Sequence, residues 1–461
     1  METSKALIPA SVRTLPLAVA AKGARIFDET GLDYIDASSG PLAVILGHGH
    51  PRLLAALAGQ FGAVDYVHRT QFRNAAAEQL AELLTVRLGG GLDHVLFTSS
   101  GSEANEIAMK FAHMYWAASG HPDKHRFVSA SVSYHGNTAG ALGASGQPRY
   151  SAAFRPLVSA GERIRAPQVY RLPVPAGSTA ARECVARLRE DFARLDTRRT
   201  AAVLLEGIGG SGAGVLVPPP GFLEELRRLC DDHDILWICD EVMSGFGRTG
   251  TWFAFQHSAA VPDIVTFAKG AGGGAVPLGG AALSGQVWEQ IARAHPAMPA
   301  GHTFTNAPLA CAAGIATIEV LEEEHVLPRV TAKGGWLGER LRELRAEFPF
   351  VGDVRGLGYM WGLEFADPVT AAPPDPALDV TGKAIAAAAA HRLILYPARF
   401  CADGTAGDAF LLAPPLTATD EEIDELLVRL RVTLASLRPL FAAKTEVSER
   451  SEGPLTSGRG G

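Results

Sequence analysis

Lys269 is the residue of this sequence whose position most directly suggests covalent chemistry. It follows the apolar, β-branched run at 264–268 and precedes a loop rich in glycine at 270–274. A lysine at the end of a buried strand is costly unless its amine is used or paired. A desolvated amine loses its proton more readily and can attack a carbonyl carbon. A strand-end lysine whose amine only reaches solvent would give the same sequence pattern. The role of Lys269 therefore depends on the residues around it.

Two carboxylates end other apolar runs. Asp240 follows residues 235–239, and Glu206 follows residues 202–205. An aspartate at the carboxyl edge of an open α/β sheet can hold a heterocyclic nitrogen protonated, bind a metal or nucleotide-bound Mg²⁺, or cap a helix. The chain has no GxxxxGK[ST] loop, which removes the nucleotide alternative. Its 14 histidines show no HExxH-like spacing, so a metal would lack further ligands.

Two further segments could hold the rest of a cofactor. Ser100, Gly101 and Ser102 follow the strand predicted at 95–98 and open a helix, where free N–H groups and hydroxyls bind phosphate. The alternative is that a serine only caps this helix. Tyr134 and His135 precede a glycine after the strand at 127–130, and the ring of Tyr134 could stack on a planar cofactor or lie at a rim.

The segment at 207–212 matches GxGxxG directly after a strand but does not predict a dinucleotide site. That site needs a helix to begin at the glycines. Here Pro218, Pro219 and Pro220 follow shortly, and prolines cannot continue a helix. We therefore reject a nucleotide loop at this place.

The composition indicates a globular protein and excludes several classes. Of 461 residues, 47% are hydrophobic and 20% charged, and the net charge of -7 argues against a nucleic-acid binder. No apolar run reaches the roughly 18 residues of a membrane span, and residues 15–21 do not read as a signal peptide. The five cysteines form no CxxC pair, which favours reduced thiols. We expect a cytoplasmic protein that binds neither nucleic acid nor a membrane.

The elements that must position these residues follow from the hydrophobic pattern. Short apolar strands alternate with helical stretches from about residue 50 to 300, which predicts an α/β fold with a mostly parallel sheet covered on both faces. Two alternating runs around an acidic turn predict a hairpin at 24–36. Further elements are expected as helices near 328–347 and 420–440 and as strands at 359–365 and 410–412.

These elements divide the chain into predicted domains. An N-terminal arm at 1–45 contributes to the small domain, and a large domain covers 46–310. The small C-terminal α/β domain covers 311–442, and the Ser-, Gly- and charge-rich residues 443–461 form a disordered tail.

Together the motifs resemble the class III pyridoxal 5′-phosphate (PLP)-dependent aminotransferases, of PLP fold type I. The resemblance runs in one order over roughly residues 20–435. The matching segments are LGHGHP at 46–51, SGSEANE at 100–106, YHG at 134–136, DEV at 240–242, GFGRTG at 245–250, AKG at 268–270, PLGG at 277–280, GHTF at 301–304, PLACAA at 308–313 and APPL at 413–416.

The resemblance implies roles for these residues. Lys269 forms a Schiff base with PLP and later carries the proton, and Asp240 pairs with the pyridine nitrogen. Tyr134 and Val242 lie on opposite faces of the ring. The remaining cofactor-binding residues are expected to be Ser100, Gly101, Ser102, His135, Glu206 and Thr303. Thr303 reaches the phosphate in the neighbouring subunit, so the resemblance implies a homodimer with shared active sites.

Three positions depart from the family pattern. Met243 stands where many relatives have Gln, Leu42 where many amine transaminases have Trp, and Leu411 where relatives that bind an α-carboxylate have Arg. Many relatives also have Glu-Pro where this chain has Glu206 followed by glycine. Arg399 could bind a substrate carboxylate, although we expect a solvated loop charge.

The sequence therefore predicts an aminotransferase that moves an amino group between a primary amine or ω-amino substrate and an α-keto acid in a ping-pong scheme. The missing arginine disfavours acetylornithine or ornithine as the donor. An aminomutase or racemase would use the same lysine, aspartate and phosphate site. A scaffold that keeps the fold without catalysis is an alternative of another class.

Overall fold

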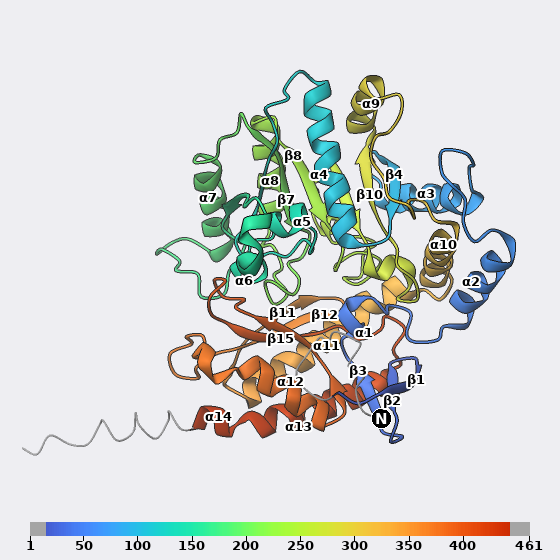
Figure 1. Ribbon diagram of the computed structural model, residues 1–461. Helices are drawn as coiled ribbons and strands as arrows, with labels where there is room; N and C mark the ends of the chain where they lie inside the picture. The colour runs from blue at the N-terminus through green and yellow to red at the C-terminus, as the bar shows by residue number, and fades with distance from the viewer. Residues whose placement is uncertain (1–14, 443–461) are drawn as a thin grey trace, which may run out of the picture.

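A seven-stranded sheet forms the centre of the larger part of the molecule (Figure 1). The computed structural model describes residues 15–442, so residues 1–14 of the predicted arm and the tail predicted at 443–461 lie outside the described residues. The strand order is β4 (Leu92–Thr98), β10 (Gly279–Ser284), β9 (Ile264–Phe267), β8 (Leu236–Asp240), β7 (Thr200–Glu206), β5 (Arg126–Ala130) and β6 (Glu162–Ile164). Within this sheet only β10 runs antiparallel to its neighbours, which confirms the mostly parallel sheet.

Both faces of the sheet are buried, which explains why its strands are continuous apolar runs. On one face, Ala202 and Leu204 of β7 share a cluster with Phe111 of α4 (Gly101–Ala118). On the other face, Val203 shares a cluster with Leu226 of α8 (Phe222–Asp232). Further helices of this part are α2 (Pro51–Ala63), α3 (Ala75–Leu88), α5 (Ala139–Ala144), α6 (Pro148–Ser151), α7 (Ala180–Phe192), α9 (Gly285–Ala294) and α10 (Pro308–Glu323).

The C-terminal part contains an antiparallel sheet in the order β11 (Val351–Leu357), β12 (Met360–Phe365), β15 (Asp408–Leu412) and β14 (Tyr396–Arg399). Its helices are α11 (Val326–Glu347), α12 (Val380–Ala390), α13 (Asp420–Leu437) and α14 (Pro439–Ala442). The strands and helices predicted for this region are present, with ends shifted by one to three residues.

The N-terminal segment lies beside this C-terminal part (Figure 1). Strands β1 (Ala18–Lys22), β2 (Arg25–Asp28) and β3 (Asp33–Asp36) form an antiparallel ribbon, which confirms the hairpin. Strand β3 pairs in parallel with β13 (Leu393–Ile394), and the short α1 (Ser39–Leu42) leads into the larger part. In residues 15–442 no helix combines the length and apolar character needed to cross a membrane.

Arg248 joins these parts from a fully buried position. Its guanidinium donates to the backbone carbonyls of Tyr359 at 3.3 Å and Pro414 at 2.5 Å, and to Ser39 Oγ at 3.4 Å. These acceptors lie before β12, after β15 and at α1. Burial lowers the pKa of Arg248 to about 9, although the carboxylate of Asp36 opposes the shift. The contact network therefore holds a desolvated cation against three separate segments.

We predict that Arg248→Met lowers the free energy of unfolding by about 2–4 kcal/mol, because two buried carbonyls lose their donor. Urea unfolding of the two proteins measures this change. Arg293→Met on α9 is a matched control: its side chain is 72% exposed, so we expect a change within about 0.5 kcal/mol. Equal effects of the two substitutions would show that the buried contacts do not stabilise the fold.

Candidate active site

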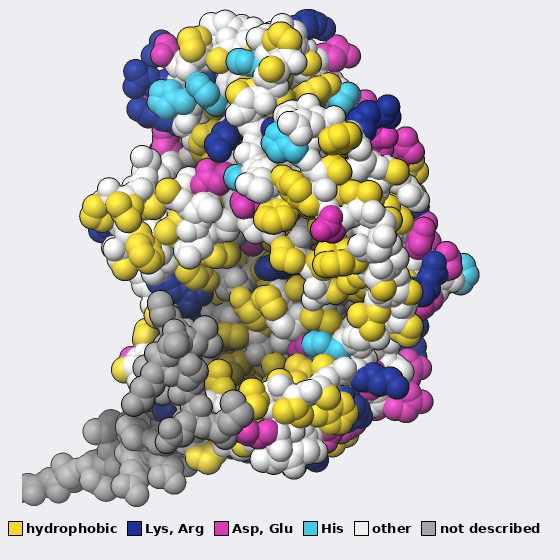
Figure 2. Space-filling view, turned by 45° about the vertical axis from the view of Figure 1, so that its right-hand side comes forward, with side chains coloured by type: hydrophobic (Ala, Val, Ile, Leu, Met, Phe, Trp, Pro, Cys, Tyr) yellow, Lys and Arg dark blue, Asp and Glu magenta, His cyan; other side chains and the backbone are white. Residues whose placement is uncertain are grey.

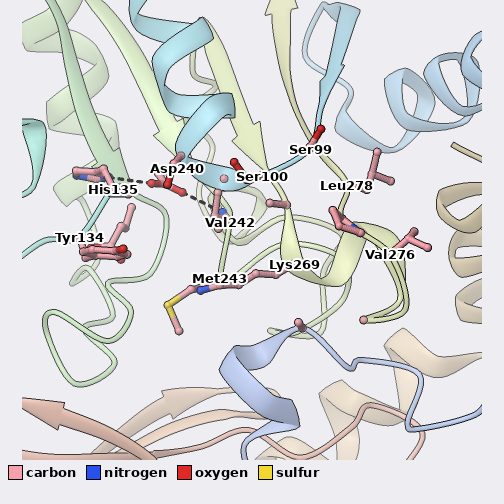
Figure 3. Close-up of a pocket in the computed structure, with 18 of the residues that line it drawn as sticks. Ser99, Ser100, Tyr134, His135, Asp240, Val242, Met243, Lys269, Val276 and Leu278 are labelled. Atoms are coloured by element: carbon pink, nitrogen blue, oxygen red, sulfur yellow. Dashed lines mark hydrogen bonds and ion pairs between the residues drawn. The ribbon is translucent and has the colours of Figure 1, made fainter. Parts of the chain in front are cut away.

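Three neighbouring strands end at one cavity of about 490 Å³ (Figure 3). Glu206 is the last residue of β7, Asp240 is the last residue of β8, and Lys269 follows β9 by two residues. All three side chains line the cavity. The prediction that the carboxyl edge of the sheet gathers these residues is therefore correct.

The cavity opens toward the boundary between the two parts of the molecule. The face drawn in Figure 2 is hollowed between its upper and lower parts, and hydrophobic side chains surround the hollow. The described lining residues include Ile208, Met243, Val276 and Leu278. A volume of this size is typical of sites for small molecules and cofactors.

Lys269 lies deep in the protein, with part of its surface facing the cavity. It begins the 3₁₀ turn η3 (Lys269–Gly272), and its φ of 45° falls in the left-handed region that non-glycine residues rarely adopt. Burial lowers the pKa of Lys269 to about 8, while the carboxylates of Asp240 and Glu206 act in the opposite direction. A strained backbone and a deprotonatable amine at one residue are features of functional sites.

Asp240 is anchored by three donors. Asn105 Nδ2 lies 2.8 Å from Oδ2, His135 Nδ1 lies 2.8 Å from the same oxygen, and the N–H of Val242 lies 3.0 Å from Oδ1. Thr266 Oγ1 donates to Asn105 Oδ1 at 2.7 Å, which orients the amide. These bonds hold a buried carboxylate in one position.

Asn105 is a functional residue to which the sequence analysis gave no role. It lies on α4, five residues after the helix cap, and meets Asp240 across 135 positions of the chain. Asn105 belongs to the SGSEANE segment at 100–106, so the family resemblance already included it. No local pattern reveals the pairing, because it depends on how α4 lies against the sheet.

Glu206 is buried beside this network. Its Oε1 accepts from the N–H of Gly210 at 2.8 Å. Burial raises the pKa of Glu206 to about 7; the carboxylate of Asp240 adds to the shift and His135 opposes it. The glycine segment that follows forms turns closed by a bridge between Gly209 and Leu216, and no helix begins before Phe222. The rejection of a dinucleotide loop is therefore confirmed.

The start of α4 forms the other end of the cavity. Ser100 caps the helix, since its Oγ accepts from the N–H of Glu103 at 3.2 Å. The N–H groups of Gly101 and Ser102 have no acceptor within the helix, as at any helix start. A Cβ at Gly101 would lie 2.8 Å from Val242 Cγ1, so only glycine fits there. Ser100 can therefore cap the helix while the free N–H groups bind an anion. The two roles that the sequence left as alternatives are compatible.

Tyr134 and His135 enter the cavity from the segment after β5. The Tyr134 ring lies 4.6 Å from the ring of Tyr150, and burial raises the pKa of its phenol. The Nε2 atom of His135 is buried and has no hydrogen-bond partner among the described residues. Ser102 Oγ accepts from the N–H of Asn137 at 3.0 Å, which ties this segment to α4.

Two residues singled out in the sequence lie away from the cavity. Thr303 is exposed and adjoins a separate hollow, where Ser99 and Glu103 are also found. Arg399 ends strand β14 and forms an ion pair with Asp379. The expected solvent-exposed charge at Arg399 is confirmed, since its side chain is 37% exposed. Its placement in a loop was wrong, because Arg399 belongs to β14, which pairs with β15.

The three departures from the family pattern belong to one apolar cluster. Leu42, Met243 and Leu411 are all buried and pack in the same group, which also contains Ile208. Met243 and Ile208 line the cavity itself. Met243 and Ile208 therefore give the cavity apolar side chains, and Leu42 and Leu411 pack in the same cluster, which favours a substrate with an apolar part.

Chemically, the cavity combines an amine, an anchored carboxylate and free N–H groups at a helix start. The amine can attack a carbonyl, the carboxylate can hold a cationic ring nitrogen, and the N–H groups can bind an anion. The apolar walls and aromatic Tyr134 suit a flat ring between them.

Comparisons with known proteins agree with this combination. Residues 8–434 match the family described as Aminotransferase class-III. The uncharacterized aminotransferase YodT of Bacillus subtilis is 35% identical over 423 residues, which cover 92% of this chain and 95% of that protein. A thermostable (S)-enantioselective omega-transaminase from Thermomicrobium roseum is 33% identical with a TM-score of 0.86, covering 94% and 96% of the two chains. A PLP-bound amine transaminase from an uncultivated Pseudomonas species is 30% identical with a TM-score of 0.85, covering 95% and 99%.

The lowered pKa of Lys269 predicts that its protonated amine lowers the free energy of unfolding of the cofactor-free protein, by an amount that depends on pH. Between its folded value of about 8 and its ordinary value of 10.5, the unfolded chain binds the proton more tightly, so stability rises with pH. Below pH 8 the full cost is present, about 3 kcal/mol, and above 10.5 it is absent.

Removing this amine should therefore stabilise the cofactor-free protein more at pH 7 than at pH 10. Urea unfolding of wild type and Lys269→Met at pH 7 and pH 10 measures the difference. Any stability gained from the apolar Met side chain is the same at the two pH values and cancels. Lys110→Met, an exposed position on α4, is the control. A stability difference that is the same at both pH values for Lys269→Met would contradict the assignment.

Proposed function

The chain belongs to the class III aminotransferase family, and we propose that it transfers an amino group between a primary amine or ω-amino substrate and an α-keto acid. It is a PLP-dependent enzyme of fold type I. The observation that carries the proposal is the cavity in which the Lys269 amine, with its lowered pKa, faces the anchored carboxylate of Asp240.

The residues of the cavity fit PLP at each of its functional groups. Asp240 holds the ring nitrogen, because it is the carboxylate fixed at the cavity floor by Asn105 and His135. The free N–H groups of Gly101 and Ser102, with the hydroxyls of Ser100 and Ser102, take the phosphate. When bound, PLP draws electrons away from the substrate carbon that carries the amine.

Further side chains hold the ring in place. Both Tyr134 and Val242 line the cavity, and they would pack on opposite faces of the ring. His135 fixes the orientation of Asp240 through Nδ1. Glu206 lies at the side of the cofactor and helps to balance the charge of Lys269. A Cβ on Gly136 would meet Ser102 Oγ at 2.6 Å, so the Tyr134 segment approaches the phosphate end closely.

Lys269 is the group that moves the proton. With a pKa of about 8, a fraction of the amine is unprotonated near neutral pH and can accept the proton of the substrate carbon. The resulting ammonium returns that proton at the adjacent acceptor carbon, so one residue acts as base and then as acid. Asp240 would pair with the ring nitrogen of bound PLP, and a keto acid would take up the amino group in a second half-reaction.

The apolar wall supports an amine or ω-amino substrate. Leu411 lies fully buried in β15 where an arginine would bind an α-carboxylate, and Leu42 and Met243 extend the same cluster. This cluster therefore offers no charged partner to a substrate carboxylate, so the α-carboxylate of the keto acid needs a partner outside it.

We also propose a cytoplasmic homodimer. Phe61, Phe72 and Phe304 expose 65%, 65% and 58% of their surfaces, and Tyr66 packs against Phe304. Exposed apolar side chains of this size can mark association surfaces. Thr303, next to Phe304, would then reach the phosphate site of the partner subunit. All five cysteines are buried free thiols, which suits a reducing compartment.

The proposal is tested by following both products of the PLP-loaded protein. With n-pentylamine and pyruvate, we expect one alanine for each aldehyde formed. Lys269→Ala should reduce the rate at least about 10³-fold, since both nucleophile and proton carrier are lost. Lys110→Ala is the matched control and should retain the wild-type rate.

Three results would contradict the proposal. Wild-type turnover in Lys269→Ala would separate the activity from this residue. Rearranged n-pentylamine without alanine would favour an aminomutase, racemisation of a chiral amine without alanine would favour a racemase, and failure to bind PLP would favour a non-catalytic scaffold.

A further inference from the structure

The proposed reaction requires a place for a carboxylate that the cavity lining does not provide. The lining contains no arginine, and Lys269 is its only lysine among the described residues. Leu411 removes the arginine of relatives that bind an α-carboxylate. A keto acid or ω-amino acid nevertheless carries a carboxylate into the site, and a buried carboxylate needs a cationic partner. A suitable cation lies among the aromatic side chains beside Tyr134.

Arg149 lies in the short helix α6, directly before Tyr150. Its guanidinium carbon is 4.4 Å from the centre of the Tyr150 ring and 5.7 Å from the centre of the Phe400 ring. Its Nη2 donates to the Tyr150 hydroxyl at 2.5 Å. Two aromatic faces therefore hold the guanidinium, as is common where arginine binds planar anions.

Tyr150 connects Arg149 to the cavity wall. The rings of Tyr150 and Tyr134 are 4.6 Å apart, and Tyr134 lines the cavity. Tyr396 is close enough to Tyr150 and Arg149 for both to affect the pKa of its phenol, which burial raises. Arg149 is thus linked through the Tyr150 ring to Tyr134, which lines the cavity.

Among residues 15–442, no carboxylate forms an ion pair with Arg149, and its buried Nε has no hydrogen-bond partner. Arg399 differs from Arg149 in this respect, because its guanidinium forms an ion pair with Asp379. A half-buried arginine that lacks a carboxylate beside an active site has unused capacity for a bidentate anion.

The surroundings of Arg149 are held in place by Gln147. This fully buried side chain donates through Nε2 to the carbonyls of Arg399 and Phe400, each at 3.1 Å. Phe400 has a φ of 58°, so its backbone is constrained in the left-handed region. The ring over Arg149 is therefore positioned before any substrate arrives, which lowers the entropic cost of binding.

We propose that Arg149 binds the carboxylate of a substrate in which several methylene groups separate that carboxylate from the reacting carbon. The class comprises ω-amino acids and the distal carboxylate of dicarboxylic keto acids. The reason for the distance is that Tyr150 packs against both Arg149 and Tyr134 while Arg149 itself does not line the cavity, so only a carboxylate well removed from the reacting carbon would reach it. The apolar cluster of Leu42, Met243 and Leu411 suits the methylene chain. This inference rests on the proposed function.

The test compares 5-aminopentanoate with n-pentylamine, which differ by the carboxylate, in PLP-loaded wild type, Arg149→Met, Arg149→Lys and Arg399→Met. In Arg149→Met, the KM for the carboxylate-bearing donor should rise roughly 10- to 100-fold with little change in kcat, because one charge-assisted contact is lost. The kinetics of n-pentylamine should be unchanged. Arg149→Lys should recover part of the loss, and Arg399→Met should behave as wild type.

A calorimetric titration with pentanoate, which has the carboxylate but no amine, gives a readout independent of turnover. The affinity for pentanoate should fall by a similar factor in Arg149→Met only. Equal losses for both donors would show a purely structural role, and unchanged 5-aminopentanoate kinetics would overturn the inference directly. If wild type converts neither donor, the proposed function fails, and the pentanoate titration alone then decides whether Arg149 binds a carboxylate.

Discussion

The structure depends on holding one buried carboxylate in a fixed place at the edge of a cavity. Asp240 can occupy that place because Asn105, His135 and the backbone of Val242 supply its hydrogen bonds. The same burial lowers the pKa of Lys269 to about 8. The anchored carboxylate of Asp240 and the Lys269 amine with its lowered pKa therefore face the same cavity.

The fold creates this pocket by ending adjacent parallel strands at the same edge. Strands β7, β8 and β9 bring Glu206, Asp240 and Lys269 together, and the start of α4 closes the other side. Local strain is concentrated at the site: Lys269 has a left-handed backbone, and Gly101 and Gly136 allow contacts that a Cβ would block. Buried contacts elsewhere, such as those of Arg248, hold the segments that surround it.

Much of this arrangement could be predicted from the sequence, because it depends on local patterns. Apolar runs located the strands, and the residues after them located Lys269, Asp240 and Glu206. Residues whose roles depend on distant contacts could not be predicted. Asn105 meets Asp240 through the packing of α4, Arg399 turned out to be strand-bound and paired with Asp379, and nothing near Arg149 indicated its aromatic surroundings. Leu42, Met243 and Leu411 were noticed separately, and only the structure shows that they form one wall.

The central claim is that Lys269 is the residue that bonds to the cofactor, and one measurement addresses it directly. The PLP-loaded protein is reduced with borohydride, digested and analysed by peptide mass spectrometry. We expect the phosphopyridoxyl group on the peptide containing Lys269, with the other lysines unmodified at stoichiometric PLP. A label on another lysine, such as Lys124 or Lys110, or no label at all, would contradict the assignment of this cavity as the active site.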